Sequence, residues 1–259
     1  MSTTQHDADV LDQFTRQAEP FVQRHREGKD GVLDLMAECA AVKPDDTLLD
    51  VACGPGIVSC FFARRVRQVT GLDFVPAMLD RARLYQTEQQ VENIQWLQGS
   101  VTELPFAADS FDCVVTRFSF HHFLSAQQAL DEMTRVAKPG GTVLVCDVAP
   151  RKEAQDRFNE WEILRDPSHT RALTEAEFEG LGLNAGLSLR RAERYGLQME
   201  VENLLSGSFP KPGDADRIRA LFDAEILAGS DNLGVAARRE AGTVRITYPV
   251  VAMAWQKPA

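Results

Sequence analysis

The chain has 259 residues, of which 44% are hydrophobic and 25% are charged, and this composition is that of an ordinary globular protein with a sizeable core. A formal net charge of -10 and a pI near 5.0 argue against nucleic acid as a partner, because binding to phosphates relies on clustered lysine and arginine. No basic region followed by an apolar one opens the chain and no long uncharged apolar run occurs, so we expect a cytoplasmic protein without membrane insertion that acts on a small molecule.

The first predicted elements are two amphipathic helices within residues 9–40, divided near residues 27–30. They precede the first predicted strand and do not belong to the alternating pattern that follows. We therefore interpret residues 1–40 as a helical N-terminal flap.

Short apolar runs alternate with helical patterns between residues 41 and 150, which is typical of a parallel sheet with helices on both faces. The predicted strands are LLDVA (48–52), VTGLD (69–73), IQWLQ (94–98), DCVVT (112–116) and TVLVCDV (142–148). We expect this part of the chain to be the cofactor-binding core.

Residues 151–259 begin with a predicted helix and a polar segment in which Thr174 and Glu177 form a capping box. Two apolar runs at 188–201 and 244–258 are predicted strands that complete the same sheet as an antiparallel edge pair. The expected fold class is therefore α/β, a doubly wound and mostly parallel seven-stranded sheet with an N-terminal flap and C-terminal lid helices.

The loop after the first strand indicates the ligand. Gly54 and Gly56 remove the side chains that would block a ligand above the strand end, and Asp73 ends the second strand where an acid can bind both ribose hydroxyls. A dinucleotide site prefers a third glycine where this chain has Ser59, and Asp50 would repel a pyrophosphate but attract an ammonium group. S-adenosylmethionine carries that ammonium, a ribose and an adenine.

Five cysteines are scattered along the chain without a CxxC pair, so no disulfide framework or metal site is expected. Cys113 and Cys146 are interpreted as small core residues. An arsenic-methylating enzyme, which would need several converging thiolates, is disfavoured by the same spacing but stays open.

Several motifs together resemble the class I S-adenosylmethionine-dependent methyltransferases, in the branch similar to ubiquinone and menaquinone C-methyltransferases. They occur in the order LLDVACGPG, GLDFVPAMLDRAR, QGSVTELPFAADSFDCVV, HHF at 121–123 and RVAKPGGTVLVCD. The resemblance implies a Rossmann-like fold, S-adenosylmethionine as the cofactor and a methyl acceptor that is a small, cyclic or aromatic molecule. The segment LRDPSHTR at 164–171 also resembles one found in a subgroup of small bacterial methyltransferases.

The cofactor residues follow from the glycine loop and from this resemblance. Ala52 stands where the family usually has the first loop glycine, and Ser100 stands where it commonly has the aspartate that accepts the adenine amino group. Met78 and Phe74 match positions beside adenine in the family, with core packing as the alternative. The expected cofactor-binding residues are Asp50, Ala52, Gly54, Gly56, Asp73, Phe74, Met78, Ser100, Val101 and Arg117.

The acceptor side is less defined by the sequence. Of the adjacent histidines we favour His121 over His122 as the residue at the pocket, and Arg117 is a charge directly after an apolar strand. In the polar segment we expect His169 and Arg171 to face the acceptor from a lid, with one histidine available as a base. If that segment is only scaffolding, the acceptor site is expected between the flap around Phe14 and Phe21 and the tail around Tyr195.

Two other functions stay open. A nucleotide-dependent oxidoreductase could use the same loop and Asp73, and a cofactor-binding module without turnover is compatible with Ala52 and Ser100. The sequence does not indicate the oligomeric state or which atom of the acceptor is methylated.

Substitution Ser100→Asp should tighten the binding of adenine-containing ligands, because a carboxylate accepts a hydrogen bond from the adenine amino group more strongly than a hydroxyl does. Calorimetry with an adenosine ligand and its inosine analogue, which lacks the amino group, measures the difference. An equal effect on both ligands would place Ser100 away from the adenine edge.

Overall fold

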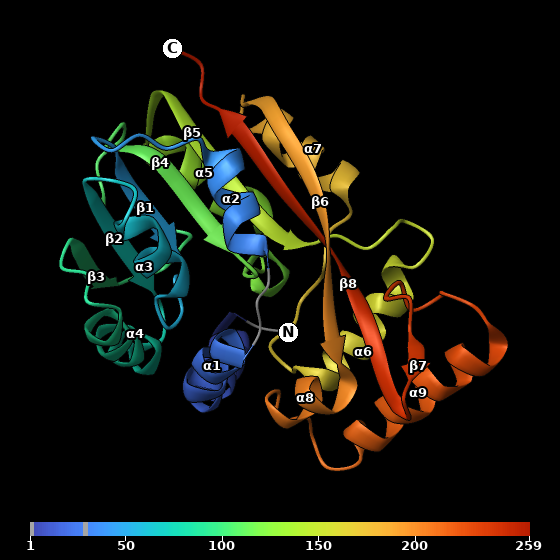
Figure 1. The fold of residues 1–259 in the computed structure, drawn as a ribbon. Helices are drawn as coiled ribbons and strands as arrows, with labels where there is room; N and C mark the ends of the chain where they lie inside the picture. Colours follow the sequence, from blue (N-terminus) through green and yellow to red (C-terminus); the bar gives the residue numbers. More distant parts are fainter. Residues whose placement is uncertain (1–2, 28–30) are drawn as a thin grey trace.

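The strands form one mixed sheet in the order β3-β2-β1-β4-β5-β8-β6, and the short β7 pairs with β8 beside that path (Figure 1). The computed structural model describes residues 3–27 and 31–259. Its strands are β1 Thr47–Val51, β2 Gln68–Asp73, β3 Ile94–Gln98, β4 Phe111–Arg117, β5 Ala137–Val148, β6 Ser188–Glu200, β7 Arg238–Glu240 and β8 Thr243–Gln256.

The sheet reverses its order between β1 and β4. The chain adds β2 and β3 on one side of β1 as parallel strands and then returns to add β4 and β5 on the other side. The tail strands β6 and β8 pair antiparallel with each other, and β8 pairs antiparallel with β5. The doubly wound α/β fold and its antiparallel edge are therefore confirmed, and the additional strand is β7, which pairs with the start of β8. Ligands bind at such a reversal in open α/β sheets.

Helices cover both faces of this sheet. Side chains of α2, α3 and α4 belong to the core on one face, and those of α5 and α7 belong to the core on the other. The helices are α1 Thr3–Glu27, α2 Val32–Ala40, α3 Ile57–Ala63, α4 Pro76–Gln89, α5 Ala126–Val136, α6 Gln155–Arg165, α7 Glu175–Asn184, α8 Val201–Ser206 and α9 Asp214–Ala228, with a 3-10 turn η1 at Phe120–His122.

The burial of each strand agrees with its position in the sheet. The central strands β1 and β4 are apolar and buried on both faces, whereas β6 lies at the edge and is largely exposed. Arg194 of β6 pairs with Glu175 at 2.6 Å, and Arg191 pairs with Glu38 at 3.1 Å. Charges of this kind protect an exposed edge from pairing with another chain.

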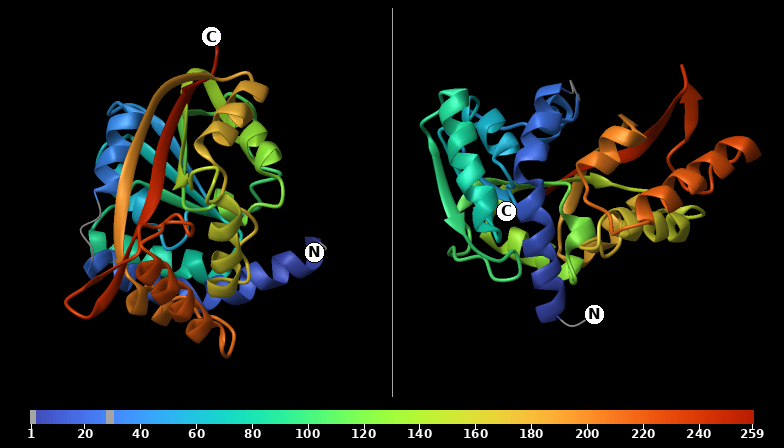
Figure 2. Two further views of the ribbon diagram at one scale, coloured as in Figure 1. Left: turned by 90° about the vertical axis from the view of Figure 1, so that its right-hand side faces the viewer. Right: turned by 90° about the horizontal axis from the view of Figure 1, so that it is seen from below.

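The N-terminal helix α1 lies across the end of the sheet, between α4 and the C-terminal helices when seen from below (Figure 2). Glu19 of α1 pairs with Arg81 of α4 at 2.7 Å. On the other side, the Gln13 amide donates to the carbonyl of Ser208. The division expected near residues 27–30 falls largely on residues 28–30, outside the described part of the chain.

None of the helices in the described ranges combines the length and the apolar character that a membrane span requires.

Two glycines of α7 give a test of the packing between this helix and the sheet. A Cβ at Gly182 would lie 2.3 Å from Nε1 of the buried Trp255, whereas a Cβ at Gly180 meets nothing within 4 Å. Gly182→Ala should lower the free energy of unfolding by about 1 to 3 kcal/mol through overpacking. The matched control Gly180→Ala should raise it by about 0.5 to 1 kcal/mol, because alanine favours the helix. Urea unfolding measures both, and a loss of stability in the control would contradict the packing described.

Candidate functional site

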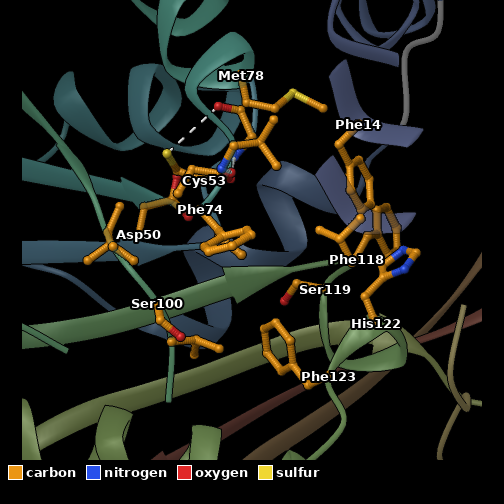
Figure 3. Close-up of a pocket in the computed structure, with 18 of the residues that line it drawn as sticks. Phe14, Asp50, Cys53, Phe74, Met78, Ser100, Phe118, Ser119, His122 and Phe123 are labelled. Carbon is orange, nitrogen blue, oxygen red and sulfur yellow. Dashed lines mark hydrogen bonds between the residues drawn. The ribbon is translucent and has the colours of Figure 1, made fainter. Parts of the chain in front are cut away.

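A cavity of about 590 Å³ lies at the carboxyl ends of β1 and β4, where the strand order reverses (Figure 3). It is lined by α1, the loop after β1, the start of α4, the turn after β3, and the segment 117–128 that follows β4. Among the described residues, none beyond Gln128 lines it. The C-terminal part of the chain therefore supports this cavity from behind and does not form the expected lid over it.

The glycine loop takes a left-handed backbone path beside the cavity. Ala52, Gly54 and Gly56 have φ angles of 53°, 53° and 82°. A Cβ on Gly54 would meet nothing within 4 Å, so this residue keeps the cavity open for a ligand. A Cβ on Gly56 would lie 2.7 Å from the ring of Trp96, and Gly56 is absent from the cavity lining. The close approach of Trp96 and the left-handed backbone explain why a glycine stands at position 56. Ala52 adopts the left-handed conformation with a side chain, which costs about 1 to 2 kcal/mol of strain.

Two buried carboxylates flank the loop. The two oxygens of Asp73 accept hydrogen bonds from the backbone N–H of Gly54 at 2.7 Å and of Val75 at 2.8 Å. Asp50 accepts a hydrogen bond from the hydroxyl of Ser59 at 2.6 Å. Burial raises the pKa of Asp50 to about 7 and the pKa of Asp73 to about 6, against the effect of these hydrogen bonds. Such a pair favours a ligand that brings a positive group and hydroxyls.

The remaining expected cofactor residues also line the cavity: Phe74, Met78, Ser100, Val101 and Arg117. The Ser100 hydroxyl shares a hydrogen bond of 2.8 Å with the Thr102 hydroxyl, and it accepts one from the Thr102 backbone N–H at 3.3 Å. The guanidinium carbon of Arg117 lies 4.8 Å from the centre of the Phe118 ring. Nine of the ten residues expected to bind the cofactor therefore line this cavity, and their contact with the cofactor stays a prediction.

Of the two adjacent histidines, His122 lines the cavity and His121 does not. The sequence prediction assumed a strand end, where neighbouring side chains alternate, but residues 120–122 form a 3-10 turn that rotates each residue by a third of a turn. His121 Nδ1 instead lies 2.6 Å from Oδ1 of Asp147. Burial disfavours a charge on His121, but the Asp147 carboxylate outweighs this and raises the pKa of His121.

The expectation for His169 and Arg171 also needs correction, because neither lines the cavity. His169 is buried behind the wall, where its Nε2 lies 2.7 Å from the Asn159 side-chain oxygen. Burial lowers the pKa of His169 well below its usual value. The Arg171 side chain is 51% exposed and pairs with Glu177 at 2.6 Å. Neither contact involves a residue of the cavity lining.

The sequence did not predict how many residues of α1 line the cavity. His6, Asp7, Val10 and Phe14 of this helix line it, and the His6 Nε2–H donates to the carbonyl of His122 at 2.8 Å. The amphipathic pattern of α1 could have indicated an apolar face turned to the protein. The alternative position near Phe14 is thus at the cavity.

Tyr195 and Phe21 also belonged to the alternative acceptor site expected from the sequence. The hydroxyl of Tyr195 accepts a hydrogen bond from the Gly31 N–H at 3.2 Å, away from the cavity. The side chain of Phe21 falls outside the described part. In the described ranges, no group of three or more histidine, cysteine, aspartate or glutamate side chains is arranged to hold a metal ion.

Comparisons with known proteins agree with this geometry. Residues 49–145 match a family described as "Methyltransferase domain". The chain is 31% identical over 194 residues to "Uncharacterized methyltransferase YcgJ" of Bacillus subtilis, covering 73% of this chain and 76% of that protein. It is 38% identical over 119 residues to "2-phytyl-1,4-naphtoquinone methyltransferase" of Thermosynechococcus vestitus, covering 44% of this chain and only 52% of that enzyme.

A solved structure also resembles the fold. The crystal structure of a putative methyltransferase from Bacillus halodurans superposes with a TM-score of 0.80 at 24% identity and covers 90% of this chain and 100% of that one. This likeness concerns the fold alone. The similarity of residues 164–171 to a particular subgroup stays a prediction.

The raised pKa values of Asp50 and Asp73 predict how ligand affinity depends on pH. Both groups are protonated below about pH 6 and charged above about pH 7, so affinity for S-adenosylhomocysteine, which carries an ammonium group, should rise by about tenfold or more from pH 5 to 8. Calorimetry at several pH values measures this. Asp50→Asn should remove the step near pH 7 and leave the one near pH 6, and a dissociation constant independent of pH would contradict the assignment.

Proposed function

Since this chain belongs to the class I S-adenosylmethionine-dependent methyltransferases, we propose that it transfers the cofactor's methyl group directly to a small, cyclic or aromatic, quinone-like acceptor. The observation that carries the proposal is the composition of the cavity. One side presents the carboxylates of Asp50 and Asp73 around the open position at Gly54, and the other is lined by aromatic rings.

The acidic side fits the cofactor. In this proposal Asp73 accepts hydrogen bonds from the ribose hydroxyls and Asp50 attracts the ammonium group, while Ser100 and the Val101 N–H contact the adenine edge; all four residues line the cavity. When bound, S-adenosylmethionine supplies a methyl group that its positive sulfonium has already made electrophilic. The absence of a Cβ at Gly54 leaves room for a ligand to lie against the loop.

The aromatic side fits the acceptor. Phe14 of α1 and Phe118 and Phe123 after β4 line this end of the cavity, together with Val10 and Leu124 (Figure 3). Such a wall excludes water and holds a flat ring in one orientation, which direct transfer requires because the accepting atom must lie in line with the bond that breaks. The partial likeness to a naphthoquinone methyltransferase supports a cyclic acceptor.

Labelled S-adenosylmethionine and a panel of acceptors test the function. We expect label in aromatic ring compounds and none in small aliphatic amines. Titration with S-adenosylhomocysteine and NADH separates the proposal from an oxidoreductase, since stronger NADH binding would overturn it. Cofactor binding without labelling of any ring compound in the panel would favour a module without turnover.

Phe14→Ala should lower kcat/KM for a ring acceptor by about tenfold, because it removes part of the apolar wall. The dissociation constant of S-adenosylhomocysteine should change less than twofold. Leu227→Ala is the matched control, since Leu227 is 90% exposed and does not line the cavity. Equal turnover in Phe14→Ala and the control would show that α1 does not contact the acceptor.

A further inference from the structure

A cluster of buried polar residues lies directly behind the cavity wall and has no part in the proposed cofactor site. Its members are His121, His122, Asp147, Glu162, Arg165, Asp166, Ser168, His169 and Tyr248. Several of them pair within the cluster: Glu162, for example, accepts hydrogen bonds from Arg165 at 2.6 Å and from the Tyr248 hydroxyl at 2.6 Å. His122 is the member that also lines the cavity.

The ring of His122 has one nitrogen turned into the protein. Its Nδ1 lies 3.1 Å from the carbonyl oxygen of Ser168 and 3.1 Å from the Ser168 hydroxyl oxygen. A carbonyl oxygen only accepts, so Nδ1 carries the proton and Nε2 keeps a lone pair. Within the described part of the chain, Nε2 of His122 makes no hydrogen bond.

Asp166 fixes this arrangement from behind. Its Oδ1 accepts hydrogen bonds from the Ser168 hydroxyl at 2.6 Å and from the Ser168 backbone N–H at 3.0 Å. Because the hydroxyl proton is used there, the hydroxyl oxygen presents only lone pairs to Nδ1–H of His122. The other oxygen, Oδ2, lies 3.8 Å from the guanidinium of Arg165 and 3.4 Å from the Gln17 amide of α1.

The surroundings also keep His122 neutral. Burial lowers the pKa of His122, and the neighbouring His121, whose ring centre is 4.2 Å away, lowers it further. The attraction of Asp166 acts in the opposite direction but is smaller. His122 therefore presents a hydrogen-bond acceptor beside the Phe14 ring, whose centre is 4.8 Å away in an edge contact.

We propose that His122 determines acceptor specificity: its Nε2 accepts a hydrogen bond from a hydroxyl group on an aromatic acceptor whose ring packs beside Phe14. This rests on the proposed methyltransferase function and adds a chemical requirement to it. An acceptor without a donor group would cover this nitrogen and leave it unpaired, and a site of this kind rejects such analogues strongly.

The same geometry gives the segment 164–171 a role. Ser168 and Asp166 are positioning residues that act through His122, and the N–H and hydroxyl of Thr170 donate to the carbonyl of His121 at 2.8 Å. The polar side chains of this segment hold the 3-10 turn and its histidine from behind the cavity wall.

The experiment compares 1-naphthol with two probes that lack its donor, 1-methoxynaphthalene, which adds a methyl group, and naphthalene, which adds none, each titrated into the protein saturated with S-adenosylhomocysteine. The wild type should prefer 1-naphthol by about tenfold or more. His122→Phe keeps a ring but removes the nitrogens, and it should lose the preference while S-adenosylhomocysteine affinity is unchanged. His122→Gln, whose amide oxygen can accept a hydrogen bond, should retain part of it.

Absence of a preference in the wild type, failure of all three probes to bind, or a preference that persists in His122→Phe would overturn the inference. Intact cofactor binding and label transfer in the same preparation would leave the proposed function standing, so the two failures are distinguishable.

A second measurement does not depend on a variant that folds. Nitrogen-15 NMR of the wild-type imidazole should show a proton on Nδ1, none on Nε2 and no titration from pH 5 to 8, and the Nε2 signal should shift on addition of 1-naphthol. Ser168→Ala removes the hydroxyl but keeps the carbonyl acceptor, so the proton should stay on Nδ1. A proton on Nε2 of His122 in the wild type would overturn the inference.

Discussion

The carboxylate of Asp73 connects the parts of the chain that form the proposed cofactor side of the cavity. One oxygen binds the N–H of Gly54 in the loop after β1, and the other binds the N–H of Val75 directly before α4. The end of β2 therefore fixes both the left-handed path of the loop and the start of the next helix. Burial disfavours a negative charge on Asp73, whereas the two N–H donors favour it. The carboxylate that stabilises the loop therefore also stays available to a ligand.

A second carboxylate, Asp147 at the end of β5, organises the opposite wall. Its oxygens accept hydrogen bonds from the N–H groups of Ser119 and Phe120 at 3.1 and 2.7 Å, and from His121 at 2.6 Å. These bonds compensate for the desolvation of a fully buried acid. They also determine which of two adjacent histidines turns inward, and so they leave His122 for the cavity.

The two ends of the chain contribute differently to the site. The N-terminal helix α1 supplies side chains to the cavity itself, whereas residues after Gln128 act on it only through contacts behind the wall. Gln17 of α1 reaches the Asp166 carboxylate, so the helix that covers the cavity and the segment that supports it are joined at one buried acid. This connection joins the packing of α1 to the geometry of the proposed acceptor side.

The sequence by itself determined the sheet, its antiparallel edge and many of the residues that line the proposed cofactor side of the cavity. These features depend on local signals: apolar runs of strand length, glycines after β1, and acids at the ends of β1 and β2. In a parallel sheet the carboxyl ends of neighbouring strands meet at one edge, so residues such as Asp50 and Asp73 come together whenever the strands form.

Only the tertiary structure decided which polar side chains line the proposed acceptor side. His121, His122, His169 and Arg171 all carry chemistry that could serve a methyl acceptor, and the sequence does not distinguish them. Their positions depend on partners in other elements: His121 contacts Asp147 of β5, His169 contacts Asn159 of α6 and Arg171 contacts Glu177 of α7. The 3-10 turn at residues 120–122 sets the direction of each ring, and the packing of α1 against it decides which side chain meets the cavity. Periodicity reports which face of an element is apolar, but the direction of a polar side chain is set by the partner that satisfies it once the elements have packed.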